Sequence, residues 1–162
     1  MRRTRWETLL GVAVVVGLLA ALLTTWSDRS GPGMPHVPWP VVAVELLIAA
    51  VVFSMGWAVR QFLRGKRPGL DPIRAARTAV LAKAASYTGA LLTGWYGGQV
   101  AAFLVDTAIP ANAGRAGSAA VAAGGAVVLA AVGLLVELFC RVPPQDKEKE
   151  HEPGATPDPA AG

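Results

Sequence analysis

Hydrophobic residues occur along the chain in four long runs that are separated by polar segments. A helix needs roughly 20 apolar residues to cross about 30 Å of hydrocarbon, and each run is about this long. The pattern therefore predicts an all-α, polytopic membrane protein with four transmembrane helices in a bundle, within a domain over residues 1–142. The predicted helices are about 8–27, 41–60, 72–105 and 116–140.

The first run, from Thr8 to Ser27, carries no charge and follows the basic segment MRRTRW. A cleaved signal peptide is the alternative. Signal peptides have shorter apolar regions, of about 7–15 residues, and end at a cleavage site of small residues. This run is longer and ends in TTWSDRS, so we expect an uncleaved first helix.

Local signals place the ends of the later helices. The second run follows VPWP, and proline suits the first turn of a helix. The third run begins at LDP, where Asp71 is the expected N-cap and Pro72 the first helical residue. Residues 143–162 are charged and rich in proline, which predicts a disordered cytoplasmic tail.

The distribution of Lys and Arg predicts the orientation, because short cytoplasmic loops carry an excess of these residues. Three precede the first helix, six lie between the second and third helices, and three lie in the tail; the other two loops hold only Arg29 and Arg115. We therefore expect a multi-pass protein of the bacterial cytoplasmic membrane with both termini in the cytoplasm. The central basic loop is predicted to contact anionic lipid headgroups. Its basic residues are Arg60, Arg64, Lys66, Arg67, Arg74 and Arg77.

One apolar run, VLAKAASYTGALLTGWYGG over 80–98, is rich in small residues and contains Lys83. At 100° per residue, several small side chains share the helix face of Lys83. Small residues let helix backbones approach each other in lipid, and Gly94 and Gly98 form a GxxxG pair. This pattern favours packing within the bundle over dimerisation. The predicted packing face consists of Ser86, Ala90, Gly94, Gly97 and Gly98.

Polar residues inside the predicted spans are the candidate functional groups, because such residues are costly in a membrane. They are Glu45, Lys83, Gln99 and Glu137. Lys83 and Glu137 are both near the cytoplasmic ends of their helices, where they could pair, snorkel to the headgroups or relay protons. A structural role is favoured because neither is near the midplane. Glu45 is expected about 7 Å inside the outer edge, if Pro40 marks that edge.

The sequence contains no motif of the common hydrolases, nucleotide-binding proteins or zinc proteases. Its single cysteine excludes an internal disulfide framework and a cysteine-based zinc site. Only 16% of the residues are charged, against about 25% in soluble domains. We therefore expect no catalytic residues, metal or cofactor, and no nucleic-acid partner for the basic loop.

Two segments of the sequence resemble a known family. They are DPIRAARTAVLAKA, from Asp71 to Ala84, and TGALLTGWYGGQ, from Thr88 to Gln99. The chain is similar over most of residues 1–145 to an actinobacterial family of small membrane proteins, domain-of-unknown-function family 3180. The resemblance implies four transmembrane helices and no established activity. Its members are often encoded near folate-biosynthesis genes.

Two functional hypotheses follow. The first is a non-enzymatic scaffold or accessory subunit that packs with an unidentified membrane partner, or with a second copy, through the small-residue face. The second is a small oligomeric transporter or ion-coupled carrier that uses Glu45, Lys83 and Glu137. Convergence of these side chains on a midplane cavity would favour the carrier, whereas a tightly packed dry face would favour the scaffold. A membrane enzyme is a third possibility without a supporting motif.

Overall fold

The computed structural model describes residues 5–31, 35–63, 72–105 and 109–140. Four helices account for nearly all of them: α1 (Trp6–Ser30), α2 (Pro40–Leu63), α3 (Pro72–Val105) and α4 (Pro110–Phe139). The all-α class is confirmed. The predicted tail over 143–162 lies outside the described residues.

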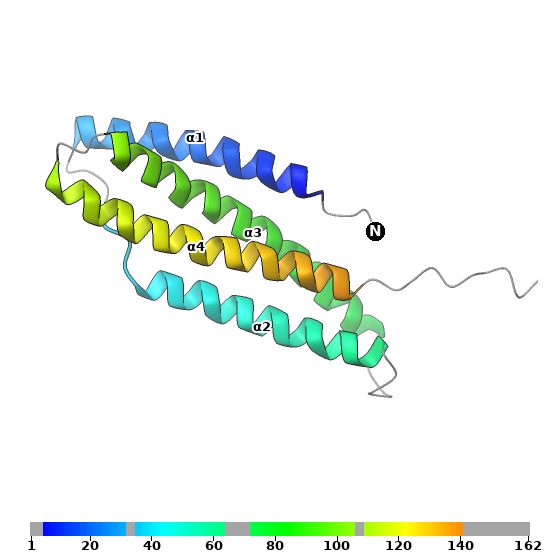
Figure 1. Cartoon of the computed structure of the whole chain (residues 1–162). Coiled ribbons are helices and arrows are strands. Elements are labelled where there is room, and N and C mark those ends of the chain that lie inside the picture. The colour runs from blue at the N-terminus through cyan, green and yellow to red at the C-terminus, as the bar shows by residue number, and fades with distance from the viewer. Residues whose placement is uncertain (1–4, 32–34, 64–71, 106–108, 141–162) are drawn as a thin grey trace, which may run out of the picture.

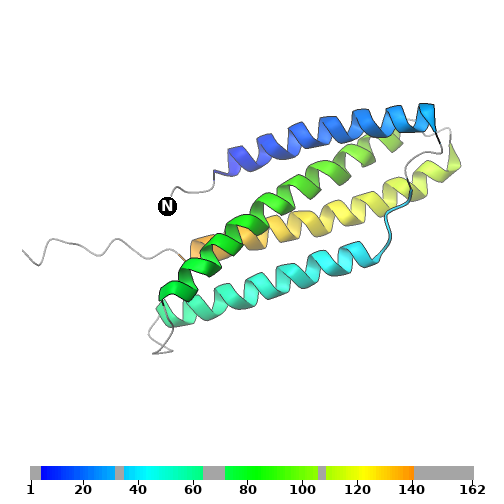
Figure 2. The ribbon, with the colours of Figure 1, turned by 180° about the vertical axis from the view of Figure 1, so that it is seen from behind.

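The helices run alternately up and down, so that α1 begins at the end of the molecule where α4 finishes (Figure 1). α3 lies between α1 and α4, and α2 packs mainly on α4 and less on α3, as both ribbon views show (Figures 1 and 2). Within the described residues, the backbone of α1 approaches no helix except α3. The four helices therefore form an open arrangement in which α1 and α2 are the outer members.

Proline begins three of the helices, at Pro40, Pro72 and Pro110. Its fixed φ suits the first turn, and its missing N–H would have had no partner there. α4 begins six residues earlier than predicted, at Pro110 instead of residue 116. The polar residues Asn112 and Arg115 end the apolar run but not the helix, because the alanine-rich segment around them favours helix.

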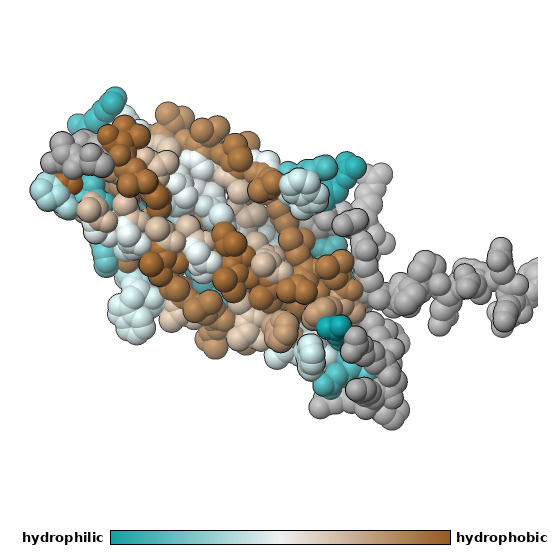
Figure 3. Space-filling model, viewed as in Figure 1, coloured by the Kyte–Doolittle hydropathy of each residue, from teal (hydrophilic) through white to brown (hydrophobic). Residues whose placement is uncertain are grey.

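Three of the helices are long and apolar enough to cross a membrane: Trp6–Ser30, Pro40–Phe62 and Pro110–Phe139. Their large apolar side chains are mostly exposed, as at Leu18 and Leu47, each 64% exposed. In the view of Figure 3, hydrophobic residues cover the sides of the helices and hydrophilic residues gather at the two ends. This distribution is the one expected for helices surrounded by lipid.

Glycine and alanine form the contacts between the helices. A Cβ added at Gly89 of α3 would lie 2.5 Å from the Ala130 nitrogen of α4, which is too close for any side chain. On the other side of α3, Gly94 and Gly98 meet the carbonyl oxygens of Ala13 and Gly17 in α1. The α1–α3 and α3–α4 interfaces are therefore backbone-to-backbone contacts that depend on small residues.

Candidate functional site

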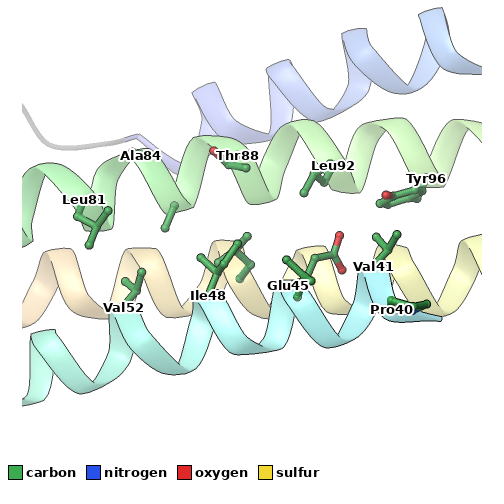
Figure 4. A pocket seen from close by; sticks show the side chains of 13 residues that line it. Pro40, Val41, Glu45, Ile48, Val52, Leu81, Ala84, Thr88, Leu92 and Tyr96 are labelled. Carbon is green, nitrogen blue, oxygen red and sulfur yellow. The ribbon is translucent and has the colours of Figure 1, made fainter. Parts of the chain in front are cut away.

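A groove of about 530 Å³ separates α2 from α3, and Leu129 of α4 contributes to its floor. Figure 4 shows side chains from α2 and α3 facing each other across this space. It extends from Pro40 and Tyr96 at one end to Val52 and Leu81 at the other. The groove arises because α2 packs mainly on α4, which leaves the α2–α3 side incompletely filled.

Glu45 supplies the only carboxylate among the residues that line the groove. Its side chain points from α2 into the space between α2 and α3 (Figure 4). The residue is only 3% exposed, and within the described part of the chain neither carboxylate oxygen has a hydrogen-bond partner. A buried carboxylate without a partner is costly, so this position is the strongest candidate for a functional group.

Gly125 of α4 makes room for the Glu45 carboxylate. A Cβ added at Gly125 would collide with Oε2 of Glu45 and would lie 3.5 Å from Val42. Any larger residue at 125 would therefore displace the acid. Gly125 is not among the residues predicted from the sequence, in which a Gly-Gly pair inside an apolar helix is its only signal.

The contact with Gly125 also gives the height of Glu45 within the helical layer. Gly125 lies near the middle of the 30-residue helix α4. Pro40 does not mark the edge of the helical layer, because α2 begins beside the interior of α4, as Figure 1 shows. The carboxylate is therefore close to mid-height in the molecule rather than near its outer rim.

Two further polar side chains line the groove, Tyr96 and Thr88, both from α3. Figure 4 places Tyr96 near the Glu45 end of the groove. All other lining residues are apolar or proline. One acid, one phenol and one hydroxyl in an apolar groove could hold a ligand that combines an apolar body with one polar group.

The other three candidate polar residues do not line this groove. Ser86 of α3 meets Gly133 of α4 in an antiparallel pair, which places Lys83 level with Val136 and Glu137 near the end of α4. Their pairing stays a prediction. Gln99 is buried, with 4% of its surface exposed, in the opposite half of α3. Lys83 and Glu137 are therefore at the same level, Gln99 is in the other half of α3, and none of the three shares the groove with Glu45.

The predicted packing face needs one correction. Ser86, Ala90, Gly94 and Gly98 are buried against neighbouring helices, but Gly97 is exposed and nothing lies within 4 Å of a Cβ placed there. The two glycines of α3 that contact α1, Gly94 and Gly98, are four residues apart, and Gly97 is turned 100° away from Gly98 on the helix.

Only part of the basic loop is described. Arg60 lies over the rings of Phe139, at 4.3 Å, and Trp57, at 5.6 Å, which joins the ends of α2 and α4 by cation–π contacts. Arg77 is exposed. Arg64, Lys66 and Arg67 lie outside the described residues, as does the side chain of Arg74.

These features define a helical protein whose apolar helices suit a membrane and whose lateral groove contains one buried carboxylate. The chain belongs to the family described as "Protein of unknown function (DUF3180)", whose model matches residues 9–144. The family predicted from the motifs is thereby confirmed. No curated protein and no solved structure matches the chain.

Proposed function

We propose that the chain is a non-enzymatic accessory or scaffold subunit of the bacterial cytoplasmic membrane. The observation that carries this proposal is the close, glycine-based packing of α3 against both α1 and α4. Backbone contacts of this kind make a rigid unit, whereas carriers need convergent polar groups near the midplane and helices that can separate. Lys83, Gln99 and Glu137 do not converge on the groove that contains Glu45, which fits the rigid unit.

We further propose that α3 is a fourth membrane span. It is less apolar than the other helices but is flanked by α1 and α4. Two of its hydroxyl groups are satisfied inside the helix: Ser86 donates to the Ala82 carbonyl at 3.0 Å and Thr93 to the Gly89 carbonyl at 2.7 Å. A helix whose polar groups are satisfied locally or covered by neighbours can cross a membrane without high hydropathy.

The proposed partner is a second membrane protein, or a second copy, that packs on the open flanks of the helix layer. The test uses two preparations, the reconstituted full chain and mildly solubilised native membranes. The mass of the particle that contains the protein is measured in each. A complex with a constant ratio of the chain to its partner would support an accessory role, provided that it is absent from membranes that lack the chain. A monomer in both preparations would contradict it.

A carrier is the second candidate, and the position of Glu45 at mid-height in an open groove favours it. Proteoliposomes would distinguish the two functions. A saturable flux that depends on a proton gradient and is lost in Glu45→Gln would establish a carrier. Equal leak in protein-containing and empty vesicles would leave the accessory role as the function.

A further inference from the structure

We infer that the groove between α2 and α3 binds an elongated lipophilic cation, of the alkylammonium type, with Glu45 as its counter-ion. The inference goes beyond the accessory role and does not depend on it. It requires only that the groove faces lipid, from which such a molecule can enter sideways. Three properties carry it: the unsatisfied carboxylate, the dimensions of the groove and the chemistry of the lining.

The carboxylate determines the charge of the ligand. Glu45 is 97% buried, and its two oxygens have no hydrogen-bond partner within the described residues. No basic side chain lines the groove. A buried acid becomes favourable when a positive, hydrogen-bond-donating group faces it, so an amine or ammonium is the complementary headgroup. An anionic or purely apolar ligand would leave the carboxylate uncompensated.

The dimensions determine the shape of the ligand. The groove follows α2 from Pro40 to Val52, a rise of about 18 Å at 1.5 Å per residue. Its volume of about 530 Å³ is spread over that length, so the groove is elongated rather than compact. An extended chain fits this shape better than a compact ligand does.

The lining determines how the ligand lies. Glu45 and Tyr96 are near the Pro40 end, and the opposite end is walled by Val52, Leu81 and Ala84 (Figure 4). The headgroup would lie between the Glu45 carboxylate and the Tyr96 ring, because aromatic rings attract cations. The apolar chain would extend toward Val52 and Leu81. This arrangement separates the charged and apolar contacts along one axis.

The test uses the full chain in nanodiscs of phosphatidylcholine, with radiolabelled decylammonium as the probe and empty nanodiscs as the background. Decanol and decanoate compete with the probe, since they carry the same ten-carbon chain with a neutral or an anionic headgroup. We expect about one saturable site per protein chain. Unlabelled decylammonium should compete at least about tenfold better than decanol, the factor expected for a hydrogen-bonded charged group.

Variants separate the contributions of head and chain. Glu45→Gln should lower the preference for the cation over decanol by about tenfold, while the shape of the groove stays the same. Glu7→Gln is the matched control, because it removes an exposed carboxylate of α1 that does not line the groove and should leave binding unchanged. Ala84→Phe should weaken binding of the cation, decanol and decanoate alike, since Ala84 lines the apolar end of the groove.

Three outcomes would overturn the inference. One is equal competition by the cation and decanol, which would leave Glu45 to serve a partner protein or helix packing. Another is unchanged cation preference in a folded Glu45→Gln variant. The third is probe binding no greater than in empty nanodiscs. None of these outcomes alters the particle mass that tests the accessory role, so the two proposals can fail separately.

Discussion

Replacing Gly98 with alanine tests how closely α1 and α3 approach. An added methyl group would collide with the Gly17 carbonyl oxygen and lie 2.8 Å from the Ala20 Cβ. Neither the backbone of α1 nor a one-carbon side chain can turn aside, so the two helices must separate. Overpacking of this kind costs roughly 1–3 kcal/mol.

The neighbouring residue provides a matched control. Gly97→Ala makes the same change one position earlier, where nothing lies within 4 Å of the added methyl. Alanine is favoured over glycine inside a helix by about 0.8–1 kcal/mol, and both variants gain this term. We therefore expect Gly97→Ala to be neutral or stabilising, and Gly98→Ala to be less stable than Gly97→Ala by about 1–3 kcal/mol.

Unfolding of both variants in mixed micelles, followed by circular dichroism during titration with dodecyl sulfate, measures this difference. Gly94→Ala should behave like Gly98→Ala, because its added methyl would meet the Ala13 carbonyl. Equal free energies of unfolding for the variants at 97 and 98 would refute the close contact between α1 and α3.

Three further predictions concern the polar residues and the topology. Glu45→Gln keeps the side-chain size and removes a desolvated acid, so thermal stability in micelles should stay constant or rise; a loss above about 1 kcal/mol would reveal a partner that the carboxylate needs. Lys83→Met and Glu137→Gln combined should lower the free energy of unfolding by less than the sum of the two single losses. A coupling energy below about 0.5 kcal/mol in this double-mutant cycle would show that the two side chains act independently. A phosphatase fused at Gly65 should be inactive, whereas a fluorescent protein fused there should fluoresce, because the basic loop is expected in the cytoplasm; phosphatase activity at this site would reverse the proposed orientation.

Hydrophobic patterning predicted the helices well for a physical reason. In lipid every backbone N–H and C=O must be paired inside its own segment, so a long apolar run has helix as its principal solution. α3, predicted over 72–105, has the same bounds in the structure. The ends were less predictable where polar residues continue a helix, as Asn112 and Arg115 do in α4.

The candidate site was predictable only in part. Glu45 was predicted because it is a carboxylate in an apolar run. The height of Glu45 in the molecule depends on where α2 begins relative to α4, and the sequence of one helix does not reveal that position. The packing face was predicted from alternating steps of three and four residues, which included Gly97. In the structure Gly94 and Gly98, which are four residues apart, contact α1 and Gly97 does not, a difference that depends on how the two helices cross.

Several hydroxyl groups in the helices are satisfied locally, which sets them apart from the Glu45 carboxylate. Thr24 donates to the Ala20 carbonyl at 2.8 Å, as Ser86 and Thr93 do to carbonyls one turn earlier in α3. A hydroxyl can make such a bond in any helix, so its presence requires no partner from outside. A carboxylate has no proton to donate when ionised and cannot use the carbonyls of its own helix. Glu45 therefore depends on a donor that the described residues do not supply, and the open groove in front of it is where such a donor can enter.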